Sequence, residues 1–223
     1  AESIIGYPNT AASQFTIDYV YKGIVRTVKT DGTGDYTTIQ AAIDAAVDSD
    51  TVLVSKGTYY ENLSIQDKNV SLKSEAGRDS TIIDGLLNGT VLKIDGSNIT
   101  VSKTIIDGFT IQKGYAENGG GVHTTSSASI TLKNSIIKDS KTSGSFGGGL
   151  YLTGSSSIIE NCVFSGNQGI EGGAICLRND EGTQINNCQF SGNTGSGSGS
   201  SIEIVYDGSG HQKITNSTFK DES

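Results

Sequence analysis

The stretch Asn-Cys-x-Phe-Ser-Gly-Asn occurs twice in this chain, first over residues 161–167 (NCVFSGN) and, 26 residues later, over residues 187–193 (NCQFSGN). Less complete copies begin at Asn134, 27 residues before the first, and at Asn216, 29 residues after the second. A nearly fixed period of this length indicates a repeat architecture. Short runs of β-branched and aromatic residues separated by Gly, Ser and Asn predict strands and turns rather than helix pairs.

These repeats predict an all-β fold, a right-handed parallel β-helix of about seven coils, with successive coils about 4.8 Å apart. The right hand follows from the usual handedness of crossovers between parallel strands. Thirty glycines and the single proline, Pro8, agree with this fold. Glycine suits tight corners, and proline cannot donate the hydrogen bond that a central strand needs.

The N-terminal part departs from the repeat and predicts a cap. Thr37 and Gln40 match a capping box at the start of a helix over Thr37–Val47, whose apolar face holds Ile39, Ala42, Ile43, Ala46 and Val47. This helix is expected to cover the open end of the first coil. The alternating stretch Phe15–Tyr21 predicts a strand outside the repeat. We therefore divide the chain into residues 1–50, the N-terminal strand and capping helix, and residues 51–223, the coils.

Alignment of the coils predicts two structural columns. Asn134, Asn161, Asn187 and Asn216 should form an axial asparagine ladder at one corner, because asparagine tolerates left-handed backbone and can hydrogen-bond along the stack. Three residues after these asparagines, Phe164, Phe190 and Phe219 should stack in the core. Cys162 and Cys188 share one position of the repeat and are expected to be stacked, buried free thiols.

A second column has mixed chemistry. If Val122, Leu150, Ile175 and Ile202 point inward, the strand alternation sends His123, Tyr151, Cys176 and Glu203 outward on neighbouring coils. Arg178 lies on the same outward face, and Asp180 lies just beyond. We take Tyr151, Arg178, Asp180 and Glu203 as candidate ligand-binding residues. The competing interpretation is an ordinary solvated strand face, because outer faces of strands are polar by default.

The net charge of −8 and the lack of a Lys/Arg-rich stripe argue against nucleic-acid binding. The same charge would repel acidic polysaccharides unless a cation such as Ca²⁺ bridged the two. No apolar run reaches membrane-spanning length, so we expect no membrane insertion. A start at Ala1-Glu2-Ser3 fits a mature product after signal cleavage, and we expect an extracellular or cell-surface location.

The N-terminal stretch over residues 27–65 resembles the opening of pectin methylesterases and of pectate-lyase-like β-helix proteins. The matching residues are Asp31-Gly32-x-Gly34-Asp35-Tyr36-x-Thr38-Ile39-Gln40-x-Ala42-Ile43 and Gly57-Thr58-Tyr59-x-Glu61-Asn62. The downstream Gly-Gly-Gly and Asn-Cys-x-Phe coils resemble right-handed β-helix repeats of bacterial and archaeal surface proteins. The chain lacks the Gln-Asp-Thr and Gly-Arg-Pro-Trp signatures of the esterases and contains no Trp.

Three functions compete on this sequence. The first is a non-catalytic extracellular β-helix that serves as a surface or structural module, which self-associates end to end through its terminal coils. The second is a polysaccharide lyase or other carbohydrate-active enzyme working on the face around Tyr151 and Arg178, with Arg178, His123 and Glu203 as candidate catalytic residues. The third is glycan binding without turnover on that same face. Shared fold does not decide among them. The missing signatures favour the first, with no cofactor and no metal site expected, and Ca²⁺ as the alternative cofactor.

Overall fold

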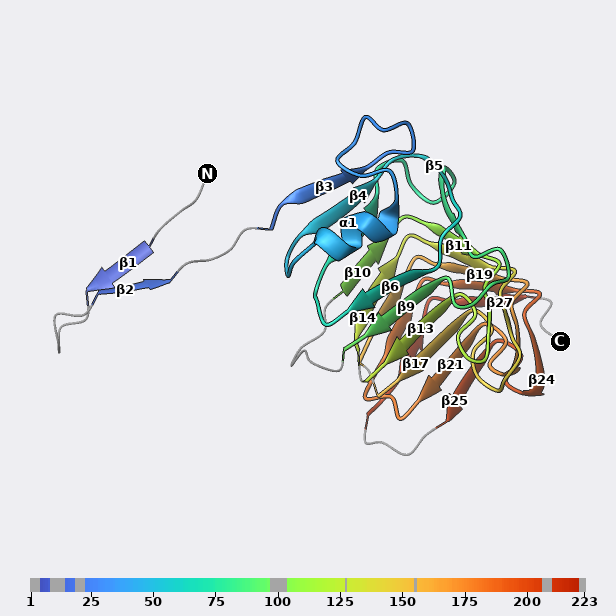
Figure 1. The fold of residues 1–223 in the computed structure, drawn as a ribbon. Coiled ribbons are helices and arrows are strands. Elements are labelled where there is room, and N and C mark those ends of the chain that lie inside the picture. The colour runs from blue at the N-terminus through green and yellow to red at the C-terminus, as the bar shows by residue number, and fades with distance from the viewer. Residues whose placement is uncertain are drawn as a thin grey trace.

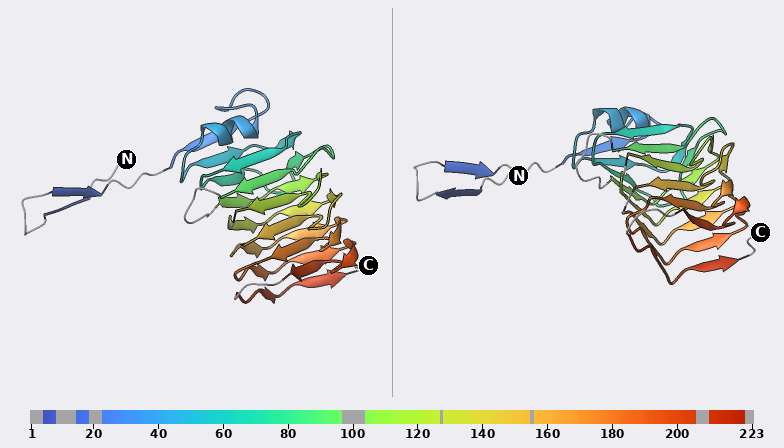
Figure 2. Two further views of the ribbon diagram at one scale, coloured as in Figure 1. Left: turned by 60° about the horizontal axis from the view of Figure 1, so that its bottom comes forward. Right: turned by 90° about the horizontal axis from the view of Figure 1, so that it is seen from below.

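The computed structural model describes residues 5–8, 15–18, 23–96, 104–126, 128–154, 156–205 and 210–220. Parallel strands wind a β-solenoid of about seven coils, in agreement with the predicted right-handed parallel β-helix, with one short helix near its N-terminal end (Figure 1). Figure 2 shows the coils side-on, stacked in chain order from blue to red. Equivalent strands of successive coils form four parallel sheets, which we number in the order in which a coil visits them.

Sheets 1 and 2 are the longest and follow each other around the coil. Sheet 1 contains β3 Val25–Val28, β4 Thr51–Val54, β7 Ser71–Ser74, β10 Thr104–Asp107, β14 Ile130–Lys133, β18 Ile158–Glu160, β22 Gln184–Asn186 and β26 Lys213–Thr215. Sheet 2 contains β5 Gly57–Tyr59, β8 Thr81–Asp84, β11 Thr110–Gln112, β15 Ile136–Lys138, β19 Val163–Ser165, β23 Gln189–Ser191 and β27 Thr218–Lys220.

Sheets 3 and 4 close the coil. Sheet 3 has four strands, β12 Tyr115–Ala116, β16 Lys141–Thr142, β20 Gln168–Glu171 and β24 Thr194–Ser198. Sheet 4 has six strands, β6 Leu63–Gln66, β9 Leu92–Asp95, β13 Val122–Thr125, β17 Leu150–Thr153, β21 Ile175–Arg178 and β25 Ile202–Val205. The coils that contain β4 and β7 therefore have three strands, and the later complete coils have four.

The helix α1, Ile39–Ala45, confirms the predicted cap but with different ends. The N-cap is Thr38 rather than Thr37, and its hydroxyl accepts a hydrogen bond from Ala41 N. The side chain of Gln40 does not close a capping box, because it donates to Asp44 and to Ser64 O of β6. The carboxylate of Glu61 instead accepts from Ile39 N and Gln40 N, both at 2.9 Å, and satisfies the first turn of the helix.

The apolar face of the helix is buried at Ile39, Ala42, Ile43 and Ala46, as predicted. The prediction that Val47 belongs to this face is wrong, because the helix ends before Val47 and its side chain is 51% exposed. The predicted strand over Phe15–Tyr21 is observed as β2, Phe15–Asp18, which pairs antiparallel with β1, Ile5–Pro8. The last three residues of that prediction lie outside the described ranges.

The predicted core stack of Phe164 and Phe190 is confirmed, and other apolar columns lie beside it. Leu132, Ile159 and Ile185 of sheet 1 are buried, as are Ile137, Phe164 and Phe190 of sheet 2. The Phe164 and Phe190 rings stack with centroids 5.2 Å apart, and Phe219 continues the stack at 4.7 Å. Phe219 differs from the other two in being 50% exposed, because β27 is the terminal strand of sheet 2. Cys162 and Cys188 are buried and free, as predicted.

The asparagine ladder is confirmed for three members. Asn134, Asn161, Asn187 and Asn216 all have φ between 51° and 56°. Asn187 Nδ2 donates to Asn161 Oδ1 at 2.7 Å, and Asn161 Nδ2 donates to Asn134 Oδ1 at 3.3 Å. Asn216 keeps the left-handed backbone, but its amide donates to Asn186 rather than to Asn187.

One repeat seen in the sequence does not stack. Thr-Ile-Ile-Asp-Gly occurs at residues 81–85 and 104–108, but the first copy forms β8 in sheet 2 and the second forms β10 in sheet 1. Their 23-residue spacing is therefore not the length of a coil. In addition, β3 pairs in parallel with β4, so sheet 1 already begins within the first thirty residues. The division of the chain at residue 50 stays a prediction.

Candidate functional site

The predicted column of sheet 4 is in register. His123 is the partner of Tyr151, Tyr151 of Cys176, and Cys176 of Glu203 on successive strands. Arg178 lies two residues further along β21, opposite Thr153. The sequence therefore placed these side chains on one face, and the roles assigned to them stay predictions.

This face is more covered than the strand alternation predicts. Tyr151 is 6% exposed and Cys176 is fully buried, so neither outward-pointing side chain is open to solvent. The cause is Phe146, which lies in the connection between β16 and β17 and stacks on the Tyr151 ring at 5.1 Å. Arg178 then lies over Phe146, with its Cζ 4.8 Å from the ring centroid.

Burial also shifts the pKa values of His123, Tyr151 and Cys176 on this face. His123 packs against Tyr151 at 5.0 Å, and burial, together with nearby Lys93, lowers the pKa of His123 to about 4. Burial raises the pKa of the Tyr151 hydroxyl, against the opposing effect of Arg178, and raises the pKa of the Cys176 thiol to about 12. At neutral pH all three groups are uncharged.

The other predicted ligand residues, Asp180, Glu203 and Arg178, do not surround an open site. Asp180 is 1% exposed, and its carboxylate accepts hydrogen bonds from Gly182 N, Thr183 N and the Thr183 hydroxyl. These bonds close a turn, which is a structural role. Glu203 is half-buried, whereas Arg178 is exposed. Among the described residues, no three His, Cys, Asp or Glu side chains gather as a metal site would need. The expectation of no cofactor stays untested.

Exposed polar side chains also lie together on a different surface, which the sequence pattern did not predict. Tyr115, Lys141, Gln168 and Thr194 are aligned on the four successive strands of sheet 3. Together with Ile170 and small residues they line a groove with a cavity of about 340 Å³. We call this surface the sheet 3 groove. Tyr115 is 47% exposed and Ile170 is 41% exposed, and the side chains of Lys141 and Gln168 are exposed as well.

The polar groups of the groove are available to a ligand. Among the described residues, no hydrogen bond or ion pair involves the side chains of Tyr115, Lys141 or Gln168. The sequence signal for this row is the Gly-rich segment that follows a sheet 2 strand. In two such segments the first residues form β12 and β16, whose alternation turns one side chain per coil outward.

A strained turn borders the groove beyond Tyr115. Leu86 and Leu87 have φ of 53° and 56° and are 60% and 51% exposed. Backbone N–H and C=O groups link Gly89 to Tyr115 in both directions at 2.9 Å, so this turn adjoins the first strand of sheet 3. Asp84, which is 2% exposed, accepts hydrogen bonds from Leu86 N and from the Gln112 and Lys113 side chains. Burial raises the pKa of Asp84, but these hydrogen bonds outweigh it and the net shift is downward.

The family model for right-handed β-helix regions matches residues 92–223. A pectinesterase/pectinesterase inhibitor from Ficus pumila var. awkeotsang is 40% identical over 103 residues, which is 42% of this chain and 18% of that protein. The probable pectinesterase/pectinesterase inhibitor 17 of Arabidopsis thaliana is 47% identical over 60 residues, 26% of this chain and 12% of that protein. The chain thus spans less than a fifth of the length of either relative.

Solved structures with the same fold are pectin methylesterases. One in complex with a hexasaccharide superposes with a TM-score of 0.57 at 19% identity, over 92% of this chain and 68% of that one. The enzyme from Erwinia chrysanthemi gives a TM-score of 0.56 at 19% identity, with the same coverage. Identity at this level shows a shared fold, and it confirms the resemblance stated from the sequence. No helix in the described part of the chain is long and apolar enough to cross a membrane.

Proposed function

Since the chain belongs to the family of right-handed β-helix regions, we propose that it is a non-catalytic extracellular surface module that contacts glycans through the sheet 3 groove. The observation that carries this proposal is the row of Tyr115, Lys141, Gln168 and Thr194, in register on four successive coils. The pectin methylesterase bound to a hexasaccharide shows that this fold can present an oligosaccharide site.

The chemistry of the row suits a sugar chain. An exposed tyrosine ring offers an apolar face with a polar tip, and an amine, an amide and a hydroxyl can each bond to sugar hydroxyl groups. Because the coils repeat at about 4.8 Å, a linear polysaccharide laid along the solenoid axis would meet a new side chain at every coil. A few placed polar groups beside apolar surface are typical of sites for small organic ligands.

The lining of the groove supports binding rather than turnover. Its residues are Tyr115, Lys141, Thr142, Gln168, Gly169, Ile170, Thr194, Gly195 and Ser196. They include no Asp, Glu or His, the side chains that most often transfer protons in glycan-cleaving enzymes. The lyase alternative uses the sheet 4 face instead, with Arg178 as the base or charge neutraliser and His123 or Glu203 as an acid.

Affinity gel electrophoresis, with polygalacturonate or a neutral polysaccharide in the gel, distinguishes glycan binding in the sheet 3 groove from the lyase alternative on the sheet 4 face. We expect Tyr115→Ala and Lys141→Ala to abolish retardation, with Lys213→Ala, an exposed lysine of sheet 1, as the control for charge. Arg178→Ala should bind as wild type does. Retardation lost in Arg178→Ala but retained in Tyr115→Ala would contradict the proposed groove. Unsaturated products that absorb in the ultraviolet in the presence of Ca²⁺ would promote the lyase.

A second candidate function, end-to-end self-association, is favoured by one observation. Phe219 is stacked on Phe190 yet 50% exposed. Ile214 of the same coil and Ile204 of β25, the last strand of sheet 4, are each 40% exposed. These residues offer an apolar layer and unpaired strand edges to a further coil. The mass in solution of the full chain, of a variant lacking residues 1–22 and of Phe219→Asp tests this. Monomers in all three at high concentration would refute it.

A further inference from the structure

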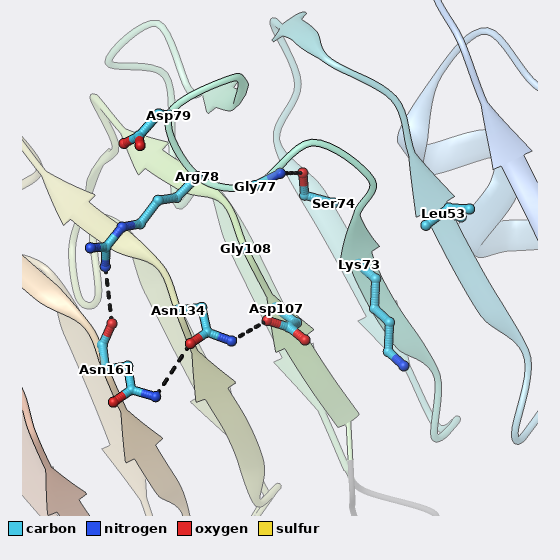
Figure 3. A pocket seen from close by; sticks show the side chains of 10 residues that line it. All are labelled: Leu53, Lys73, Ser74, Gly77, Arg78, Asp79, Asp107, Gly108, Asn134 and Asn161. Atoms are coloured by element: carbon cyan, nitrogen blue, oxygen red, sulfur yellow. Dashed lines mark hydrogen bonds between the residues drawn. The ribbon is translucent and has the colours of Figure 1, made fainter.

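We infer that a pocket on the outer side of sheet 1 binds a small organic anion, such as a carboxylate- or sulfate-bearing molecule. The pocket has a cavity of about 510 Å³ and lies on sheet 1, away from the groove lining. Figure 3 shows its side chains, with Lys73 of β7 and Arg78 of the following loop on opposite sides and Asp107 and Asn134 between them. A volume of this size is typical of small-ligand sites.

The wall of the pocket is a loop that the fold holds in place. Ser74 Oγ accepts from Ala76 N and Gly77 N, which starts the turn over residues 75–80. The carbonyl of Arg78 accepts from the Thr110 hydroxyl at 2.8 Å. Arg78 Nη1 donates to Asn161 O, three coils further along sheet 1, at 3.0 Å. The pocket is therefore preformed, which lowers the entropic cost of binding.

Glycine makes the floor of the pocket. Gly108 has a φ of +85°, and a Cβ there would lie 3.3 Å from Ser74 Cβ and 3.6 Å from Gly77 Cα. A side chain at this position would push against the overhanging loop and fill the space beneath it. The loop and the β10 turn can thus enclose a cavity because residue 108 has no side chain.

Apart from the carboxylate of Asp79, the side-chain oxygens of Asp107 and of the ladder asparagines in the pocket already accept hydrogen bonds or an ion pair. Asp107 Oδ1 accepts from Asn134 Nδ2 at 2.7 Å, and Asp107 Oδ2 lies 3.5 Å from Lys133 Nζ. Asn134 Oδ1 accepts from Asn161 Nδ2, and Asn161 Oδ1 accepts from Asn187. The ladder and the ion pair thereby take up the carboxylate and the amide oxygens.

The donors are in surplus. Among the described residues, no hydrogen bond or ion pair engages Lys73 Nζ, and Arg78 uses only Nη1. A guanidinium has five N–H donors and an ammonium has three, so most remain for a ligand. Asp79 also lines the pocket, and among the described residues no ion pair joins it to Arg78. In a chain of net charge −8, two half-buried cations with free donors favour a ligand with anionic oxygens.

A titration followed by two-dimensional NMR tests the site, with succinate as the probe and neutral succinamide as its isostere. Succinate should shift the amide signals of Lys73, Gly77 and Gly108, and succinamide should not. Acetate should bind more weakly than succinate if both cations are engaged, and sulfate should compete if the oxyanion rather than the carbon chain is recognised.

Lys73→Gln and Arg78→Gln should each weaken succinate binding about tenfold, the effect of losing one charge-assisted hydrogen bond. Lys213→Gln makes the same change in net charge on β26 and should bind as wild type does. Among the described residues the Lys73 ammonium makes no hydrogen bond or ion pair, so its variant should fold normally even if the Arg78 variant loosens the loop. Equal shifts with succinamide, or undiminished affinity in Lys73→Gln, would overturn the site. The outcome is independent of binding in the sheet 3 groove.

Discussion

Replacing Asn167 by alanine should destabilise the solenoid far more than changes in the exposed ladder. Asn167 is fully buried, and its Oδ1 accepts from Ser140 N at 3.2 Å. Its Nδ2 donates to Ile137 O at 2.9 Å and to Asn193 Oδ1 at 3.0 Å. Alanine would leave Ser140 N without its partner, at about 1–3 kcal/mol, would remove the side-chain bonds to Ile137 O and Asn193, and would leave a cavity. We expect a loss of about 3–5 kcal/mol in the free energy of unfolding.

Urea unfolding measures this loss, with Asn187→Gly as the matched control. Asn187 belongs to the exposed ladder, and glycine keeps its φ of 51°, so its loss should be about 1 kcal/mol or less. Asn167→Asp keeps the acceptor for Ser140 but replaces the donor by a second oxygen. Burial should raise the pKa of that carboxyl, so the variant should be most stable at low pH and lose stability as pH rises through the folded pKa. Similar losses for Asn167→Ala and Asn187→Gly would refute the reasoning.

Two further outcomes follow from the packing. In urea unfolding, Phe164→Ala should lower the free energy of unfolding by about 3–5 kcal/mol. Phe219→Ala, whose ring is 50% exposed, should cost about half as much or less. Because burial lowers the pKa of His123 from 6.5 to about 4, the unfolded chain binds the extra proton between these values. Wild-type stability should therefore fall as pH drops from 6.5 to 4, and urea midpoints of His123→Gln should lack this contribution.

The sequence was enough to predict the columns of residues that recur at the length of one coil. Spacings of 27 and 26 residues put Asn134, Asn161 and Asn187 one above another, because each of these coils adds one strand to sheet 1 and one to sheet 2. The same spacing aligned Phe164 with Phe190. The step to Asn216 is longer, at 29 residues, and there the side-chain bond moves to Asn186. Small changes in coil length are absorbed at the turns without losing strand register.

Identity of short motifs did not reveal which corner of the coil they occupy. The two Thr-Ile-Ile-Asp-Gly copies lie in different sheets because β-branched residues suit any buried strand. The buried ladder of Asn167 and Asn193 was also missed, although both copies of the repeat carry it. Gly166, at a φ of +64°, turns the chain before Asn167, so the alternation counted from Phe164 does not carry across it. Burial of Tyr151 depends on Phe146 from a connection, which periodicity does not describe.

The Lys113–Asp84 ion pair should hold the turn that borders the groove. Two leucines in left-handed backbone cost about 1–2 kcal/mol each, and the carboxylate of Asp84 fixes this turn through Leu86 N at 2.9 Å. Lys113 Nζ lies 2.9 Å from Asp84, so Lys113→Met should lower the free energy of unfolding at pH 7.

The pH dependence of that loss separates the ion pair from simple packing of the lysine stem. The folded pKa of Asp84 lies below its ordinary value, so its contribution is complete at neutral pH and is lost as pH falls through the folded pKa. The difference between wild type and Lys113→Met should therefore shrink in acid, whereas Lys138→Met, on the neighbouring strand β15, should show no such trend. A difference that stays constant from pH 7 to pH 3 would mean that Lys113 acts through its methylene groups. The strained turn beside Tyr115 would then be held by Gln112 and the backbone alone.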